Sequence, residues 1–166
     1  MIFVSVGMHH QGFDRLIRAM DILAPSLGEP VVMQIGASSY RPRNARYFRF
    51  ASSEEVEALT RDARVIVTHC GVGSILTAIR HGVPVVVVAR LKRFAEHVDD
   101  HQLELARVLS ESGKVTVVHD VASLGQAIAQ ATVPPIMDDR RRELVEALSQ
   151  CLRELAGQPG QEVARP

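Results

Sequence analysis

The sequence predicts an α/β protein built on a single Rossmann-like, doubly wound parallel sheet. A chain of 166 residues, 46% of them hydrophobic, can bury one good core but hardly two. Short β-branched runs recur along the chain, and segments with helical spacing separate them. Strands that alternate with helices imply parallel crossover connections. We therefore expect one domain over residues 1–156, followed by a disordered tail at 157–166, which holds glycines and prolines without periodicity.

Each predicted element rests on a local pattern. Continuous apolar runs of strand length, typical of strands covered on both faces, are found at residues 2–6, 31–35, 65–68, 83–88 and 115–118, with a weaker one at 46–50. Apolar residues at helical spacing predict helices over residues 13–24, 53–61, 73–81, 98–112, 121–130 and 138–155. Ser52 or Ser53, standing before Glu55, resembles a helix start.

Composition and charge disfavour several classes of function. The formal net charge is zero and aromatic residues make up 4% of the chain, which disfavours nucleic-acid binding. The two cysteines, Cys70 and Cys151, lack metal-type spacing and suit a reducing cytoplasm better than a disulfide framework. No basic leader opens the sequence, and no apolar run approaches the roughly 20 residues that a membrane-spanning helix needs. We expect any membrane contact to be peripheral or to pass through a partner.

Three loops of the predicted sheet carry most of the polar chemistry. Ligands of doubly wound sheets bind outside the carboxyl ends of the strands, so the residues that directly follow each strand are the informative ones. Five of the seven histidines fall in three such loops, at residues 7–12, 69–74 and 89–102. The sequence therefore predicts a ligand site where these loops meet.

The loop at 69–74 is typical of an anion-binding site, and the anion we expect there is a diphosphate. Gly71 and Gly73 allow close backbone approach, and a helix beginning near Ser74 would offer unpaired N–H groups and a positive dipole end. The alternative is a tight strand-to-helix turn that needs glycine and is capped by Ser74. No lysine follows Gly73 and the spacing is not GxGxxG, so P-loop and standard dinucleotide interpretations are weak.

The segment at 96–102 is the densest polar stretch, and three interpretations are open. The side chains of residues 99–102 could bind the vicinal hydroxyls of a sugar. They could instead form a solvated, Asp-capped helix start. His97 and His101, four residues apart beside carboxylates, could also bind a metal ion, although the HExxH pattern is absent.

Histidines and cations in the same loops have functional and structural interpretations. His9 and His69 each follow a strand and could contact phosphate or transfer protons, or could simply anchor the loops by hydrogen bonds. Arg90, Lys92 and Arg93 could neutralise a diphosphate, face anionic lipid, or belong to a solvated face.

Four stretches taken together resemble a known family. In order they read MIFVSVGMHHQGFDRLIRAMD, QIGASSYRPRN, VTHCGVGSI and GVPVVVVARLKRFAEHVDDHQLELA. This combination resembles the glycosyltransferase family 28 C-terminal domain from Met1 to about Gly113, and EHVDDHQ is its most specific element. It is most similar to stand-alone donor-binding subunits, those of dolichol-linked N-acetylglucosaminyl transfer and of bacterial exopolysaccharide β-1,4-galactosyl transfer.

The resemblance implies the C-terminal half of a GT-B enzyme. The implied activity is inverting transfer of a hexose or N-acetylhexosamine from a UDP-sugar to a lipid-linked acceptor, with no cofactor and no metal. The implied partner is a membrane-associated, acceptor-side glycosyltransferase subunit, which would carry the general base and place this chain in the cytoplasm, peripheral to the inner membrane. The chain alone could self-associate, and the predicted helix at 138–155 could dock the partner or pack on its own sheet.

Family positions also imply roles for particular residues. The residues expected around the donor diphosphate are Gly7, His9, His69, Gly71, Gly73 and Ser74. Thr77 and Arg90 fall at the nucleotide and ribose positions. The residues expected to address the sugar are Glu96, Asp100, His101 and Gln102.

The chain departs from the family pattern at several positions. Thr77 stands where relatives usually have the glutamate that holds the ribose hydroxyls, and Met8 replaces a threonine near the expected phosphates. Cys70 replaces a small residue, and Ala89 a proline. Thr77 and Met8 favour an alternative function, a non-catalytic regulatory or scaffolding subunit that has lost tight donor binding. A third alternative is a metal-dependent hydrolase built on Asp100 and the two neighbouring histidines.

Overall fold

The computed structural model describes residues 1–99, 101–113 and 115–132. Its centre is a six-stranded parallel sheet in the order β3-β2-β1-β4-β5-β6. The strands are β1 (Ile2–Ser5), β2 (Val31–Gln34), β3 (Arg46–Phe48), β4 (Val65–His69), β5 (Val85–Val88) and β6 (Thr116–Val118). This order reverses between β1 and β4, which confirms the predicted doubly wound sheet. The predicted helix at 138–155 and the predicted tail at 157–166 lie outside the described residues.

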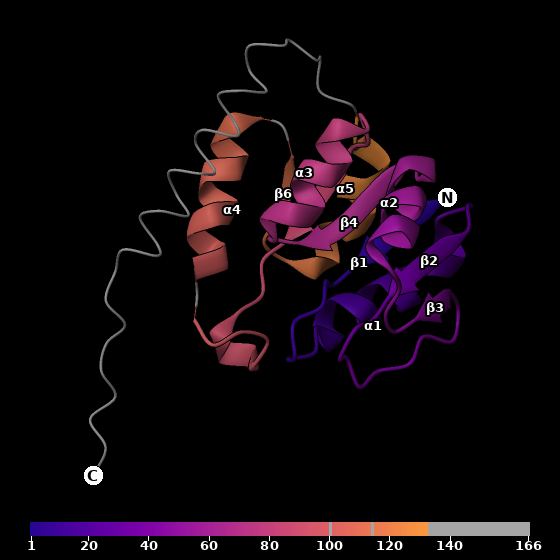
Figure 1. The fold of residues 1–166 in the computed structure, drawn as a ribbon, viewed down its shortest axis with the longest axis horizontal. Helices are drawn as coiled ribbons and strands as arrows, with labels where there is room; N and C mark the ends of the chain where they lie inside the picture. The colour runs from indigo at the N-terminus through magenta and orange to yellow at the C-terminus, as the bar shows by residue number, and fades with distance from the viewer. Residues whose placement is uncertain (100, 114, 133–166) are drawn as a thin grey trace.

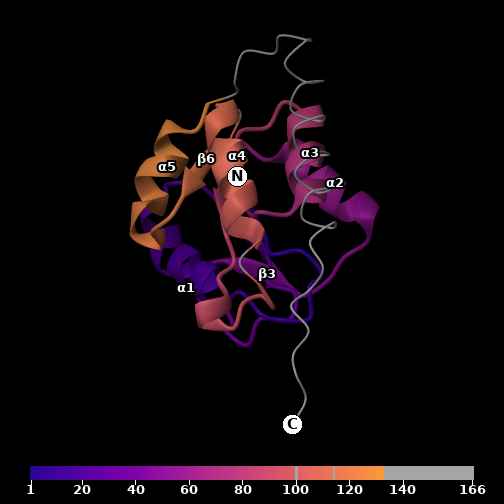
Figure 2. The same cartoon turned by 90° about the vertical axis from the view of Figure 1, so that its left-hand side faces the viewer.

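Helices cover both faces of the sheet. They are α1 (Asp14–Leu23), α2 (Ser53–Asp62), α3 (Val72–Arg80), α4 (His101–Ser112) and α5 (Leu124–Gln130), with short 3₁₀ turns η1 (Ala24–Ser26), η2 (Lys92–Phe94) and η3 (Val121–Ser123). Figure 1 shows the elements in order, and Figure 2 shows α1 and α5 on one side of the sheet with α2 and α3 on the other. The alternation of strands and helices therefore produces the three layers that it predicts.

Strand alternation divides the core into two clusters. Val4 and Val67 point into the cluster shared with α1 and α5, whereas their neighbours Phe3 and Ile66 point into the cluster shared with α2, α3 and α4. Successive side chains of a strand face opposite sides of a sheet, so a strand covered on both sides must be apolar throughout. This requirement explains the unbroken Val85–Val88 run of β5, whose four side chains are all buried.

The start of α2 confirms the predicted capping signal and assigns it to Ser52. The Ser52 hydroxyl accepts a hydrogen bond from the Glu55 N–H at 3.2 Å, and the Glu55 carboxylate accepts one from the Ser52 N–H at 2.8 Å. Such a capping box satisfies two N–H groups that the helix itself leaves unpaired. It fixes the first turn of α2 at the carboxyl end of the sheet.

Several boundaries differ from the predicted ones. β5 begins at Val85, not residue 83, because Pro84 precedes it and has no N–H to donate to the ladder. The predicted helix at 121–130 is divided into η3 and α5, with the Asp120 carboxylate capping η3 through the Ala122 N–H at 3.0 Å. α4 begins at His101, three residues later than predicted.

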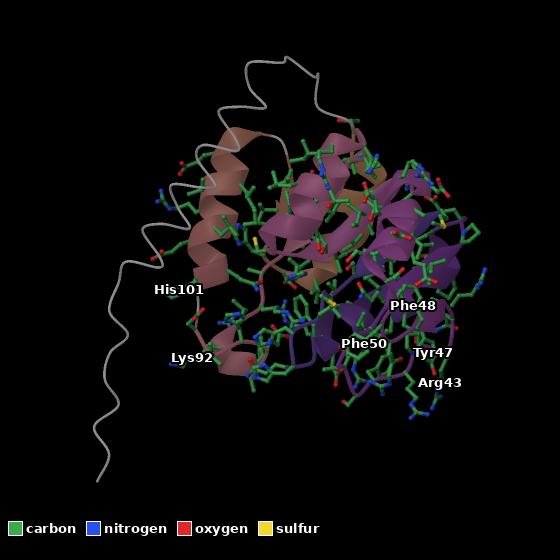
Figure 3. The ribbon with its side chains drawn as sticks, in the orientation of Figure 1. Arg43, Tyr47, Phe48, Phe50, Lys92 and His101 are labelled. Atoms are coloured by element: carbon green, nitrogen blue, oxygen red, sulfur yellow. The ribbon has the colours of Figure 1, made fainter. Side chains whose placement is uncertain are left out.

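Two aspartates of α1 tie down the long connection between β2 and β3. Asp14 accepts hydrogen bonds from Ser39, and the buried Asp21 accepts them from the Arg43 and Asn44 N–H groups and from the Tyr40 hydroxyl. Burial opposes ionisation of Asp21, but these hydrogen bonds outweigh it and lower its pKa. The connection is therefore packed against α1. The aromatic side chains that follow it, Tyr47 and Phe50, lie at the β3 end of the molecule (Figure 3).

Candidate functional site

A cavity of about 350 Å³ opens at the carboxyl ends of the central strands, between α2 and α3. Its lining includes Gly7 and Met8 after β1, Ser53 and Glu57 from α2, and Gly73 and Thr77 from α3. This is the edge of the sheet at which the sequence predicts a ligand site, next to the point where the strand order reverses.

The first turn of α3 faces this cavity without a cap. Gly71 is the N-cap residue in an extended conformation, and no side chain of the described residues caps the turn. The alternative in which Ser74 caps the helix is wrong, because the helix begins at Val72 and Ser74 is its third residue. An added Cβ on Gly73 would meet no atom within 4 Å. The N–H groups and dipole of this helix end are therefore available to an anion.

Gly7 and Gly71 are glycines because the His69 ring lies against both of them. A Cβ on Gly7 would lie 2.7 Å from His69 Cε1, and a Cβ on Gly71 would clash with His69 Nε2. Gly7 also has a φ of 73°, a region that other residues rarely adopt. These two glycines are thus explained by packing around the imidazole, whereas Gly73 is the one left open toward the cavity.

Burial and the charge of Arg90 hold His69 in its neutral form, and a hydrogen bond defines its tautomer. The Thr68 hydroxyl donates to the Ser5 carbonyl at 2.8 Å, so the 3.3 Å contact between Thr68 Oγ1 and His69 Nδ1 makes Nδ1 the donor. Nε2 is then the unprotonated nitrogen, next to Gly71. Burial, followed by the charge of Arg90, lowers the pKa of His69 to about 4. A neutral imidazole can accept a proton or a hydrogen bond at this position.

Acid should destabilise the fold through His69. The unfolded histidine titrates near 6.5 and the folded one near 4, so between these values only the unfolded chain binds the proton. The free energy of unfolding should therefore fall by about 3 kcal/mol as the pH is lowered from 6.5 to 4. Urea unfolding at a series of pH values measures this change.

This experiment needs two variants: His69→Gln is the test and His119→Gln is the control. His69→Gln removes the titrating group and should flatten the pH dependence in this window. His119 is exposed near the end of β6, so the same change there should leave the dependence intact. An unchanged slope in His69→Gln would contradict the assignment.

The loop after β1 and the loop after β5 meet through stacked histidines. The His9 ring stacks on His10 at 4.3 Å and on His97 at 4.8 Å between centroids. The Gln11 N–H donates to His9 Nδ1 at 3.2 Å. Burial, then the charges of His97 and Arg90, lower the pKa of His9. His9 therefore lies at the predicted meeting point of two loops, on the side of His97.

Asp99 holds both histidines of the EHVDDHQ stretch. Its carboxylate contacts His97 Nδ1 at 2.9 Å and His101 Nδ1 at 3.1 Å, and it accepts from the His101 N–H. Burial opposes ionisation of Asp99, but the His101 N–H and the two imidazoles lower its pKa on balance. Asp100 lies outside the described residues. Within 1–99, 101–113 and 115–132, no group of three His, Cys, Asp or Glu side chains is arranged to hold a metal ion.

Arg90 is a buried internal contact of the loops. It is 1% exposed. Its Nη1 donates to the carbonyls of Gln11 (2.9 Å), Gly12 (3.0 Å) and Glu96 (2.9 Å), and its Nη2 donates to that of Val6 (2.7 Å). Burial lowers its pKa to about 10, so the guanidinium stays charged at neutral pH. One side chain thus fastens the loop after β1 to the loop after β5.

Glu96 and Gln102 belong to the same internal network. Glu96 is 4% exposed, forms a two-point ion pair with Arg15 of α1 at 2.8 and 3.0 Å, and accepts from the Leu91 N–H. The Gln102 side-chain oxygen accepts from the Arg90 N–H at 3.0 Å. Ala95, just before Glu96, has a left-handed φ of 56°. These contacts hold the loop after β5 in place.

The structure therefore separates the predicted site residues into groups. Five of the six expected around a diphosphate gather at the mouth of the cavity and around His69: Gly7, His69, Gly71, Gly73 and Ser74. The sixth, His9, stacks on His97 instead. His101 lies at the start of α4, on the side of the molecule that carries Lys92 (Figure 3). Two residues near these loops and the cavity, Arg15 and Glu57, were not predicted from the sequence. Arg15 is separated by 81 residues from the glutamate it contacts, and nothing local in the sequence signals that contact.

Several glycosyltransferases are among the solved structures with a similar fold. The glycotransferase of kitacinnamycin is 22% identical with a TM-score of 0.63, over 90% of this chain and 39% of that one. CalG4, the calicheamicin glycosyltransferase, is 21% identical with a TM-score of 0.58, over 90% and 39%. SsfS6 of Streptomyces sp. SF2575, complexed with thymidine diphosphate, is 22% identical with a TM-score of 0.56, over 95% and 41%.

The chain spans about two fifths of the length of these proteins, and at such identities the likeness shows the fold. It confirms the predicted fold class, that of the C-terminal half of a GT-B glycosyltransferase. The family model of the glycosyltransferase family 28 C-terminal domain matches residues 1–136, further than the resemblance at 1–113. The chain belongs to the glycosyltransferase family 28 C-terminal domain family.

Proposed function

We propose that this chain binds the donor in a two-component glycosyltransferase, which transfers a hexose or N-acetylhexosamine from a UDP-sugar to a lipid-linked acceptor. The observation that carries the proposal is the uncapped first turn of α3, open at Gly73, at the mouth of a cavity of about 350 Å³. A helix start of this kind stabilises phosphate oxygens. Membership of the family supports the assignment of that phosphate to a nucleotide sugar.

The proposed chemistry is an inverting displacement in which UDP leaves as the acceptor oxygen bonds to the sugar carbon. Negative charge builds on the departing diphosphate, and the α3 dipole and its N–H groups stabilise that charge without reorganisation. His69, held neutral beside Gly7 and Gly71, can accept a proton or a hydrogen bond only through Nε2. The proposal places the general base that deprotonates the acceptor on the partner.

The acceptor side and the membrane contact are assigned to a separate polypeptide. No helix in the described ranges is both long enough and apolar enough to cross a bilayer. The resemblance to stand-alone donor subunits supports a membrane-associated partner that recruits this chain to the cytoplasmic face. Self-association of the isolated chain follows from the same proposal, because half of a GT-B enzyme leaves a partner surface exposed.

Calorimetry and a transfer assay test the proposal. The purified chain should bind UDP with a dissociation constant below about 1 mM, and UMP at least about tenfold more weakly because it lacks the second phosphate. With membranes that contain the partner, radiolabelled UDP-sugar should yield a lipid-extractable product, and membranes without this chain should not. Failure to bind UDP at millimolar concentration, both alone and with those membranes, would contradict the proposal.

A non-catalytic regulatory or scaffolding subunit is the second candidate. Three observations favour it: Thr77 lines the cavity where a carboxylate is expected, Met8 is 75% exposed at its mouth, and Arg90 is occupied by internal contacts. This candidate predicts no UDP binding but retained association with the partner. The same calorimetric titration therefore separates the two functions.

A further inference from the structure

The cavity between α2 and α3 continues away from the phosphate end along α3. Gly73, Thr77 and Arg80 line it at successive turns of the helix. Thr77 follows Gly73 by four residues, or about 6 Å along the helix axis. The ribose of a nucleoside diphosphate is joined directly to the α-phosphate. A nucleotide with its phosphates at the first turn of α3 therefore has its ribose beside the next turn.

Thr77 itself is poorly placed to hold a ribose. Its hydroxyl accepts a hydrogen bond from Arg80 Nη2 at 3.3 Å, and it offers a single oxygen. A vicinal diol presents two O–H donors, and a carboxylate accepts both of them. Thr77 therefore does not supply a group that accepts hydrogen bonds from both hydroxyls of a ribose.

Glu57 brings a carboxylate to the same part of the cavity from the opposite wall. Among the described residues that line the cavity, it is the only acidic side chain. His81, the C-cap residue that directly follows α3, lies with Nε2 2.8 Å from Glu57 Oε1. This contact draws the carboxylate of α2 toward α3. In the described part of the chain no hydrogen bond involves the second oxygen, Oε2.

Glu57 favours the ionised form, which is the form that accepts hydrogen bonds from ribose hydroxyls. The hydrogen bond with His81 lowers its pKa, and the positive charge of Arg80 acts in the same direction. The side chain lines the cavity and is 46% exposed, so the carboxylate is accessible to a ligand. A carboxylate that is fixed through one oxygen and open at the other is a preorganised acceptor for sugar hydroxyls.

We infer that Glu57 of α2, positioned by His81, binds the ribose hydroxyls of the donor nucleotide and so takes the role that a carboxylate at position 77 would have. This assignment rests on the proposed function. It gives the donor class a physical basis: a site that binds the 2′-hydroxyl favours ribonucleotides over 2′-deoxyribonucleotides such as thymidine diphosphate.

Paired titrations with UDP and 2′-deoxyuridine diphosphate test the assignment. Wild type should prefer UDP by at least about tenfold, because the deoxy analogue lacks the 2′-hydroxyl that the carboxylate accepts. In Glu57→Ala the preference should fall to about twofold or less, because UDP should lose more affinity than the deoxy analogue, which has only the 3′-hydroxyl to lose from this contact. Glu54→Ala, an exposed glutamate of the same helix that does not line the cavity, is the matched control and should keep the preference.

Two results would overturn the assignment while leaving the proposed function intact. The first is a Glu57→Ala protein that still prefers UDP as strongly as wild type. The second is a gain of about tenfold or more in UDP affinity on Thr77→Glu, since that gain would mean that the site lacks a carboxylate. A wild-type protein that binds neither nucleotide overturns the proposed function, and this inference with it.

Discussion

Arg90→Ala should lower the free energy of unfolding by about 3–5 kcal/mol. The guanidinium is buried and donates to four carbonyls, so its removal leaves oxygen atoms of Val6, Gln11, Gly12 and Glu96 without these donors. Each buried acceptor that loses its partner costs about 1–3 kcal/mol. The same change also leaves a cavity beside the Phe13 ring, which lies 4.9 Å from the guanidinium carbon.

Urea unfolding monitored by circular dichroism measures this loss. Arg90→Lys keeps the charge but cannot reach all four carbonyls, so its stability should fall between wild type and Arg90→Ala. Arg107→Ala removes an exposed arginine of α4 and should change the midpoint little. If Arg90→Ala unfolds at the wild-type midpoint while losing UDP affinity, Arg90 contacts the ligand and the scaffold role is wrong.

The sheet was predictable because its signals are local. Runs such as Val85–Val88 are apolar on both faces, and this pattern is incompatible with an edge that is open to water. The Ser52 and Glu55 pair marked the start of α2 by a four-residue pattern. The strand-to-helix alternation then placed the three loops at one edge of the sheet, where the cavity lies.

The internal roles of the loop residues were not predictable from the sequence. Arg90 and Glu96 are residue types common in ligand sites, and nothing local shows that their partners are carbonyls of the loops after β1 and β5 and an arginine of α1. Gly71 carried a similar ambiguity, because a glycine that admits a ligand and a glycine that admits an imidazole look alike in sequence. Only the placement of His69 separates the two interpretations.

Gly73→Asp should reduce UDP affinity by at least about 100-fold without destabilising the protein. The new side chain has room, since a Cβ at this position meets nothing within 4 Å. An acidic residue in the first turn favours the helix, and loss of a helical glycine adds up to about 1 kcal/mol of stability. The carboxylate would occupy the anion position and repel the diphosphate. Gly73→Asn is the uncharged control of matched shape, and its loss of affinity should be much smaller.

The most direct test is an amide-resolved NMR titration of wild type and Gly73→Asp with UDP. The N–H groups of Val72, Gly73 and Ser74 in wild type should shift in a saturable manner, and those of the variant should not. The contradicting result would be unchanged chemical shifts of the α3 amides together with changes around a second cavity. That cavity has a volume of about 290 Å³ and is lined by Ala89 and Leu91. That result would place the nucleotide away from the start of α3 and contradict the proposed donor site.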